Sequence, residues 1–460
     1  MGKPRDIDSQ MDQPLLFTDL DTESGAARPA RRIKAPVTRA PRVSQSKAGS
    51  MPIHKFAEHL RTFQEFGKQT LETTSEAVTF EGLPLHVPTF VNEYWTSKQR
   101  AASSLHEISY RACFKPQLPR FFIERLTIPG GRVYDPFMGR GTTPLEAALL
   151  GRVPVGCDVN PLAVQLIRPR LTPPRLEQVE ARLREIDWSA SEPVWEDLLT
   201  FYHPETLRGL TALKNYLQRR RAKGTSDTID DWITLVALNR LTGHSPGFFS
   251  VYTLPPNQAA SLKSQKRINE KRNQTPPPRD IQKILLKKSR LLLSDCSEST
   301  RVTLDSVASQ AQFITSASGH TPQIASNSVD LVVTSPPFLD IVQYAADNWL
   351  RCWFLGIDPA DIKITMATRL PAWQETMTGV FQELYRVLKP GGAAAFEVGE
   401  LAKGKIKLEL AALPCAVASG LKPELILINA QIFTKTANCW GVDNNDKGTN
   451  TNRVILLTKS

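Results

Sequence analysis

The segment Thr334-Ser335-Pro336-Pro337-Phe338 ends an apolar run and carries residue types that suit the binding of a planar amine. Its two prolines hold the backbone stiff and have no N–H group, so neighbouring carbonyls are free to face a ligand. The Ser335 hydroxyl and a carbonyl can accept hydrogen bonds from an exocyclic NH₂ group, while the Phe338 ring stacks on the base. Holding the amine in this way aims its lone pair at a methyl donor. A stiff strand end with a core phenylalanine is the alternative.

A second segment, Asp135–Thr142, reads Asp-Pro-Phe-Met-Gly-Arg-Gly-Thr between a short strand and a helix. Gly139 and Gly141 allow a tight turn and a close approach of a ligand to the backbone. The next strand ends at Asp158, where an acid can accept hydrogen bonds from both hydroxyls of a ribose. Asp135 would repel a phosphate, so a ligand with a ribose and a positive centre fits better. S-adenosylmethionine is such a ligand, and an ordinary tight turn is the alternative.

The helix after this turn carries start and stop signals. Thr143 suits the N-cap, Pro144 the first helical position, and Glu146 completes a Thr-x-x-Glu capping box. Gly151 stands where a glycine that ends a helix belongs.

Together the two segments resemble the DNA amino-methyltransferases, which methylate cytosine N4 or adenine N6. The resemblance covers about residues 101–170 and 313–460 and implies S-adenosylmethionine as the cofactor. It also implies an N-terminal motif, His106–Pro119, on the methionine end of the cofactor. The implied cofactor-binding residues are Phe114, Lys115, Pro116, Asp135, Phe137, Gly139, Gly141, Thr142, Asp158 and Thr334. The implied catalytic residues, which hold a base flipped out of the duplex, are Ser335, Pro336, Pro337 and Phe338.

The chain departs from the family's pattern in two places. Its aromatic is Phe338 rather than the commoner tyrosine, and the acid usual after the third strand is replaced by the run Thr315–Ser318. Serine before the prolines is more typical of cytosine N4 enzymes, whereas aspartate dominates among adenine N6 enzymes. We therefore expect a site-specific cytosine N4 methyltransferase. An adenine N6 enzyme, an RNA base methyltransferase and a catalytically silent nucleic-acid-binding subunit remain open.

The surrounding elements alternate between strands and helices. We expect helices over 54–68 and 118–126, and after the middle of the chain over about 341–355, 372–388 and 408–419. Strands are expected over 313–316, 329–334, 393–398, 424–433 and 453–458, with Lys389-Pro390-Gly391-Gly392 as a stop and turn. This order predicts an α/β fold, a doubly wound Rossmann-like methyltransferase sheet with a mostly helical insertion. Ligands of such sheets bind beyond the carboxyl ends of the strands.

Composition divides the chain into four expected parts. Residues 1–50 mix Pro, Ser, Arg and Ala without apolar periodicity and read as a flexible basic arm, and Met51 is an alternative start. Residues 51–170 form the N-terminal part of the core with the cofactor motif. Residues 171–310 form a helical insertion for target recognition and DNA binding, and 311–460 form the C-terminal part of the core.

The overall composition excludes several classes of protein. With 41% apolar residues among 460, the chain can build a sizeable core. No apolar run reaches the length of a membrane span, and no signal peptide opens the chain. The six cysteines are scattered, which argues against a metal site and a disulfide scaffold. We expect an intracellular protein of the cytoplasm, associated with the nucleoid.

The net charge of +11 is unevenly placed. Seven basic residues and no acid lie between Arg28 and Lys47, and ten basic residues with two acids lie between Lys263 and Ser294. Such segments favour a polyanionic partner, here double-stranded DNA, although a solvated face is equally compatible. A restriction endonuclease as a second partner and the oligomeric state stay open. The residues expected to contact nucleic acid are Arg219, Arg220, Arg221, Lys263, Lys266, Arg267, Lys271 and Arg272.

Four further features have two readings each. Asp340, Tyr344, Asp347 and Trp349 either order the base pocket or form plain helix surface. Phe248, Phe249 and Tyr252 either contact bases or pack inward. The amide-rich stretch 438–452 either touches DNA or forms turns. Cys415 lies in an Ala/Leu-rich helix and is expected in the core rather than as a nucleophile.

Overall fold

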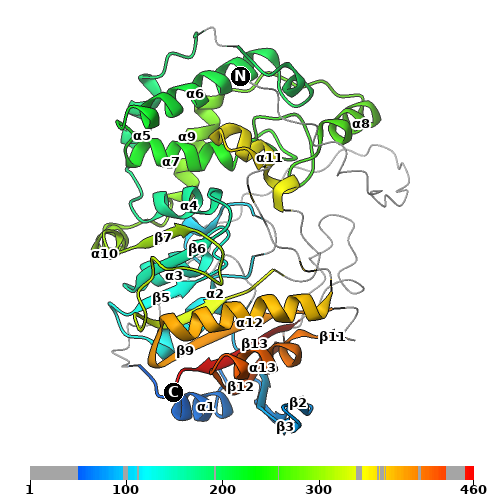
Figure 1. Cartoon of the computed structure of the whole chain (residues 1–460). Coiled ribbons are helices and arrows are strands. Elements are labelled where there is room, and N and C mark those ends of the chain that lie inside the picture. The colour runs from blue at the N-terminus through cyan, green and yellow to red at the C-terminus, as the bar shows by residue number, and fades with distance from the viewer. Residues whose placement is uncertain are drawn as a thin grey trace. The chain divides into compact units, whose positions relative to one another are not determined.

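A computed structural model of the protein describes residues 50–96, 102–110, 113–190, 193–256, 258–337, 344–359, 362, 367, 369–401, 406–430 and 451–460. These residues lie within one compact unit. Nine strands among them form a single sheet (Figure 1). In spatial order they are β1 (Leu71–Thr74), β4 (Pro88–Asn92), β12 (Lys422–Ala430), β13 (Thr451–Thr458), β9 (Leu388–Val398), β8 (Val329–Thr334), β5 (Arg132–Asp135), β6 (Val153–Asp158) and β7 (Gln312–Thr315).

The sheet is mainly parallel. Strands β7, β6, β5, β8 and β9 run in the same direction, whereas β13 lies antiparallel between β9 and β12. Strand β4 runs parallel to β12, and β1 lies antiparallel at the edge. From β5 the chain adds β6 and β7 on one side, and then β8 and β9 on the other side. The point where the order reverses, between β5 and β8, is the topological switch point of the sheet.

Helices cover both faces of this sheet, because successive residues of a strand point to opposite sides. On one side Val133 of β5 packs with α1 (Ile53–Arg61) and α2 (Gln117–Leu126). On the other side Tyr134 packs with α12 (Leu370–Val387) and α13 (Leu408–Ala418). The predicted doubly wound α/β fold is therefore confirmed.

A layer of helices follows β6 in the chain, where the sequence predicts a helical insertion. The apolar side chains of these helices form one buried cluster. The cluster also contains residues of α11, a helix that follows β8 in the chain. None of the described helices is both long and apolar enough to cross a membrane. The helices and 3₁₀ turns from α3 onward are α3 (Thr142–Leu149), α4 (Leu162–Ile167), η4 (Arg168–Arg170), α5 (Leu176–Arg184), η5 (Glu196–Thr200), α6 (Pro204–Ala222), α7 (Thr228–Leu238), α8 (Leu262–Arg272), α9 (Ile281–Leu292), α10 (Glu298–Ala308) and α11 (Tyr344–Leu355). Helix α10, although within the predicted insertion, packs against α3 and β6.

The capping box predicted for α3 is wrong. The helix begins two residues earlier than predicted, at Thr142 rather than Pro144, and Gly141 in a left-handed conformation is its N-cap. Thr143 instead donates its hydroxyl hydrogen to the carbonyl of Val333 in β8, at 3.0 Å. Glu146 instead contacts His106. Both side chains are buried, so their partners come from neighbouring elements rather than from the local helix end.

Other boundaries also differ from the sequence-based expectation. The helix expected over 54–68 ends at Arg61, and strands β1 and β4 were not predicted. Two small hairpins were not predicted either, formed by β2 (Val78–Phe80) with β3 (Leu83–Leu85) and by β10 (Glu400–Leu401) with β11 (Ile406–Lys407). Helix α12 ends just before Lys389–Gly392, as predicted. These residues do not form a separate turn but an irregularity inside β9, where Leu388 pairs with Val329 and Ala393 with Leu331.

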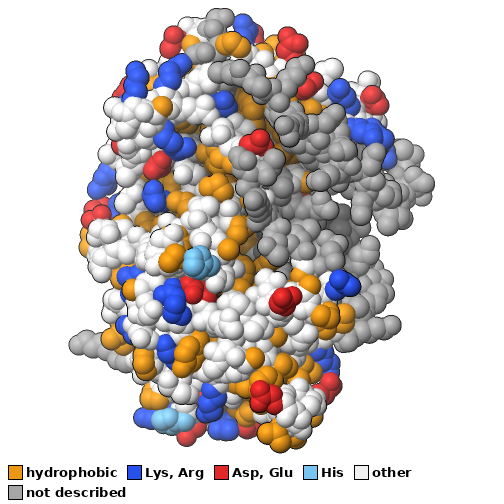
Figure 2. Space-filling view, viewed as in Figure 1, with side chains coloured by type: hydrophobic (Ala, Val, Ile, Leu, Met, Phe, Trp, Pro, Cys, Tyr) orange, Lys and Arg blue, Asp and Glu red, His pale blue; other side chains and the backbone are white. Residues whose placement is uncertain are grey.

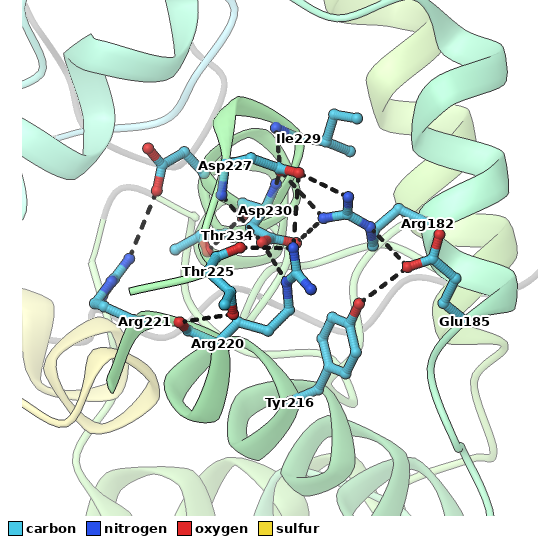
Figure 3. A network of polar contacts seen from close by, with 11 residues as sticks. Arg182, Glu185, Tyr216, Arg220, Arg221, Thr225, Asp227, Ile229, Asp230 and Thr234 are labelled. Atoms are coloured by element: carbon cyan, nitrogen blue, oxygen red, sulfur yellow. Dashed lines mark hydrogen bonds and ion pairs between the residues drawn. The ribbon is translucent and has the colours of Figure 1, made fainter. Parts of the chain in front are cut away.

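A buried ion network links α5, α6 and α7 (Figure 3). Asp230 of α7 has only 1% of its surface exposed and accepts hydrogen bonds from Arg182 of α5 and from Nε of Arg220 of α6, the latter at 2.6 Å. Asp227 caps α7 and pairs with Arg182 Nη2 at 2.7 Å. Since these helices hold one another through opposite charges, the network stabilises the helical layer.

We expect Asp230→Ala to destabilise the protein by about 3 kcal/mol, because two arginines of a largely buried network lose their common partner. Chemical unfolding measures the change. Asp231→Ala is the matched control, since Asp231 is more exposed and its nearest ion-pair atom, on Arg221, is 3.8 Å away. Equal loss in the two variants would contradict a stabilising role of the network.

Candidate functional site

The carboxyl ends of β5 and β8 meet at the switch point of the sheet. Asp135 ends β5 and Thr334 ends β8. The Thr334 hydroxyl donates to Oδ1 of Asp135 at 2.6 Å, and the backbone N–H of Phe137 donates to the same oxygen at 3.0 Å. One carboxylate therefore connects the glycine turn to the Ser-Pro-Pro segment.

Two carboxyl groups lie at this edge of the sheet. Asp135 is 1% exposed, and burial raises its pKa to about 7 against the opposing effect of its hydrogen bonds. Burial also raises the pKa of Asp158, whose Oδ1 accepts from the N–H of Asn160 at 2.9 Å. Two acids in a poorly solvated place favour a cationic ligand and disfavour a phosphate. This donor set fits a ligand with a sulfonium and a ribose.

The glycine turn depends on the absence of side chains. Gly141 has φ +76°, and a Cβ atom there would lie 2.8 Å from Cβ of Ile167. Gly139 has φ +48°, and its N–H donates to Oδ2 of Asp158 at 2.9 Å. Gly156 of β6, which the sequence reading missed, leaves room for Met138, since a Cβ would lie 2.4 Å from the Met138 sulfur. Its signal was only a glycine inside a strand.

Arg140, inside the glycine turn, ties the N-terminal motif to the site and was also missed by the sequence reading. Its guanidinium donates to the carbonyls of Ile108 at 3.0 Å, and of His106 and Phe114 at 3.5 Å. The side chain is 6% exposed, so these carbonyls replace water around a buried charge. Phe114, Lys115 and Pro116 are thereby held beside the turn, and burial together with the charge of Arg140 lowers the pKa of Lys115.

A second buried contact joins the N-terminal motif to α3. Nε2 of His106 lies 2.7 Å from Oε1 of Glu146, and both side chains are buried. Burial lowers the pKa of His106, despite the opposite effect of Glu146. A neutral imidazole that donates from Nε2 to Glu146 is consistent with this environment, and it fixes the motif against the helix that follows the turn.

Two hydrogen bonds from neighbouring helices hold the Ser-Pro-Pro segment at the end of β8. Beside the contact of Thr143 with Val333, the indole N–H of Trp373 in α12 donates to the carbonyl of Pro337 at 3.3 Å. Ser335, one residue beyond Thr334, lies beside Glu397 of the neighbouring strand β9, because Thr334 pairs with Phe396. Phe338 lies outside the described residues. The structure thus brings Ser335, Pro336 and Pro337 to the same edge of the sheet as Asp135.

The remaining predicted features separate into packed and exposed residues. Phe248 and Phe249 are buried, whereas Tyr252 is 36% exposed with the guanidinium of Arg272 3.8 Å from its ring centroid. Asp347 and Trp349 are buried in α11, and Cys415 is buried in α13. Asp340, the side chain of Tyr344 and residues 438–450 of the amide-rich stretch lie outside the described residues. No cluster with the composition of a metal site occurs in the part of the chain that the structure describes.

The basic residues predicted to bind nucleic acid differ in their surroundings. Arg220 is engaged with Asp230, and Arg221 donates to Gln165 at 3.0 Å, while Arg219 is exposed. The basic residues of α8 are all exposed, and Figure 2 shows basic side chains where Figure 1 places this helix. They are Lys263, Lys266, Arg267, Lys271 and Arg272. Helix α8 is thus the most open basic surface among the predicted residues.

Comparison with known proteins gives the family. Residues 64–169, which include the N-terminal motif and the glycine turn, match the N6/N4 methyltransferase family, described as DNA methylase. Residues 64–169 thus form a segment of the DNA amino-methyltransferase type. S-adenosylmethionine is the methyl donor of this family.

Two curated methyltransferases are similar in sequence. Type II methyltransferase M.BsoBI of Geobacillus stearothermophilus is 23% identical over 56% of this chain and 54% of its own length. Type II methyltransferase M.MvaI of Kocuria varians is 31% identical over 18% of this chain and 19% of its own. The chain thus spans about half of the first relative and a fifth of the second.

Some solved methyltransferase structures are similar to this chain, with low TM-scores and low sequence identity. The rRNA methyltransferase aviRa from Streptomyces viridochromogenes is 12% identical with a TM-score of 0.31, over 79% of this chain and 93% of its own. The TehB-like SAM-dependent methyltransferase from Corynebacterium glutamicum is 9% identical with a TM-score of 0.28, over 74% of this chain and 87% of its own.

We expect Asp135→Asn to stabilise the protein relative to wild type, by an amount that grows from about pH 4 to about pH 7 and then levels off. The pKa of Asp135 rises from 3.8 to about 7 on folding. In that window the folded state keeps a proton that the unfolded state has lost, so wild-type stability falls as pH rises, by up to roughly 1.4 kcal/mol per pH unit. Asparagine keeps the acceptor oxygen and carries no proton to lose. Urea unfolding at a series of pH values measures the difference, and a difference independent of pH would contradict it.

Proposed function

We propose that this protein is a site-specific DNA methyltransferase that transfers a methyl group from S-adenosylmethionine to the exocyclic amine of a flipped base, cytosine N4. One observation supports this above all: the hydrogen bond between Thr334 and Asp135 joins the two motif segments at a single edge of the sheet. A methyl donor over the glycine turn and an amine on the Ser-Pro-Pro segment would then be neighbours. Proximity of this kind is the main source of rate in a direct displacement.

The residues proposed to hold the cofactor surround the glycine turn. Asp158 would accept from the ribose hydroxyls, and Asp135 with Phe137 would lie near the positive end. The backbone of Gly139, Gly141 and Thr142 would give close approach, with Phe114–Pro116 at the methionine end. Bound S-adenosylmethionine would supply a methyl group on a positively charged sulfur. The amine lone pair would form the new N–C bond as the C–S bond breaks with its electron pair left on sulfur, and the methylated nitrogen would then lose a proton to solvent.

Ser335 is the residue proposed to hold the amine. Its hydroxyl oxygen and a neighbouring carbonyl accept the N–H hydrogens, which turns the nitrogen lone pair toward the methyl group. The indole of Trp373, bonded to the Pro337 carbonyl, keeps the segment in place. Serine rather than aspartate at this position carries the choice of cytosine over adenine.

DNA is the proposed substrate, and α8 is the proposed contact to its phosphates. Five exposed basic residues on one helix supply a salt-sensitive attraction that does not depend on sequence. Both curated relatives bear the name Type II methyltransferase, and we propose the same role here, paired with a restriction endonuclease. Such an enzyme would work in the cytoplasm, at the nucleoid.

We expect the purified protein with S-adenosylmethionine to produce N4-methylcytosine in unmethylated DNA, and Ser335→Ala to lower the rate at least tenfold with unchanged cofactor affinity. Nucleoside mass spectrometry measures the product, and calorimetry the affinity. N6-methyladenine instead would change the base and keep the mechanism. Product only in a matched RNA sample would refute DNA as the substrate, and cofactor binding without product on genomic DNA or RNA would favour the silent subunit.

We expect the triple variant Lys263→Gln, Lys266→Gln, Lys271→Gln to weaken DNA binding and to lower the slope of log affinity against log salt by up to about 2.7, or about 0.9 for each lost phosphate contact. The turnover number at saturating DNA should hold. The control replaces the exposed Lys55, Lys223 and Lys422 with glutamine, an equal charge change elsewhere. Equal loss of affinity in both variants would show that only net charge matters.

A further inference from the structure

A buried acid lies beside the Ser-Pro-Pro segment on the neighbouring strand. In the register of β8 with β9, Thr334 pairs with Phe396. The next residues along the two parallel strands are Ser335 and Glu397, so their side chains meet at the carboxyl end of the sheet. On its other side Glu397 pairs with Val454 of β13.

The Glu397 carboxyl group lies between Asn452 on one side and Ser335 on the other. Nδ2 of Asn452 in β13 donates to Oε1 of Glu397 at 3.0 Å. The pairing of Thr334 with Phe396 places Ser335 beside the same carboxyl group. Only 7% of Glu397 is exposed, and burial raises its pKa against the opposing effect of Ser335 and Asn452.

An acid in such a place costs stability, because burial removes water from the carboxylate and two neutral donors replace it only in part. An apolar residue at this position of a core strand would avoid the cost. Groups kept at a cost in a binding crevice are characteristic of functional sites.

We propose that Glu397 is a positioning residue for methyl transfer, which accepts the hydroxyl hydrogen of Ser335 and so leaves the lone pairs of that oxygen facing the target amine. This inference rests on the proposed function. A serine hydroxyl has one hydrogen and two acceptor lone pairs. Without a partner for its hydrogen, the hydroxyl can rotate and donate to the amine nitrogen, which would occupy the lone pair that has to attack the methyl group.

Asn452 has a supporting role in this arrangement. Its amide donates to one carboxylate oxygen of Glu397 and so restrains the plane of the group, which would leave the other oxygen for Ser335. Ser335 directly follows β8, and Glu397 and Asn452 lie on the adjacent strands β9 and β13. Their order across the sheet is therefore set by backbone pairing, not by side-chain flexibility.

The test is a double-mutant cycle in the full chain with Glu397→Gln and Ser335→Ala. In Glu397→Gln the amide oxygen can accept from Asn452, but the NH₂ group then donates to Ser335 and occupies a lone pair. We expect the turnover number to fall on the order of tenfold to a hundredfold, as for other residues that orient a reacting group. The KM for DNA and the affinity for S-adenosylmethionine should change less than twofold.

Coupling between the two sites separates a positioning role from a general structural one. In the Ser335→Ala background, Glu397→Gln should have less than a twofold further effect, because the hydroxyl through which it acts is gone. Glu383→Gln is the matched control. Glu383 is a buried acid of α12 that accepts from Thr321 and Arg386, away from Ser335. Whatever effect it has on turnover should be the same factor in both backgrounds.

Asn452→Ala provides a second variant, should Glu397→Gln fold poorly. It leaves the acid in place and removes its orientation, so we expect a smaller loss of turnover that also disappears in the Ser335→Ala background. Thermal unfolding and cofactor binding check each variant. Wild-type protein without methylation of DNA or RNA would refute the proposed function itself. An active wild type with Glu397→Gln unchanged, or reduced by the same factor in both backgrounds, would overturn only the role of Glu397.

Discussion

The site depends on one buried carboxylate at the switch point of the sheet. Asp135 ends β5 and needs hydrogen-bond donors because it has almost no contact with water. It takes one from the backbone of the glycine turn and one from Thr334, at the end of β8. The requirement to satisfy a buried acid therefore connects two segments that lie far apart in the chain. Both halves of the proposed reaction, donor and acceptor, inherit their relative position from this bond.

The N-terminal motif is held in place by a buried group of the opposite charge, which also needs hydrogen-bond partners. Arg140 is buried, and it is surrounded by backbone carbonyls of the motif rather than by acids. The His106–Glu146 contact adds a second buried attachment to α3. The glycine turn thus organises the segments on both sides of it, and an altered charge there would affect more than the cofactor.

Basic residues of the helical layer either form buried ion pairs or face solvent, depending on the residues around them. Arg182 and Arg220 neutralise Asp230 inside the layer and stabilise it. The basic residues of α8 face solvent, and Arg272 packs on Tyr252. Composition cannot distinguish these cases, since it counts both as positive charge. Burial and the presence of an acid on the next helix make the difference.

The sequence alone determined the α/β class, the glycine turn and the Ser-Pro-Pro segment, because strand alternation, glycines and prolines act within a few residues of the chain. It also placed most strands and helices of the C-terminal half to within a few residues. The tertiary structure alone decided the neighbours of Glu397, Arg140 and Gly156, and the true partners of Thr143 and Glu146. Each of these residues acts on a neighbour that is distant in sequence, and only the order of strands in the sheet makes the two adjacent. Local patterns carry no record of that order.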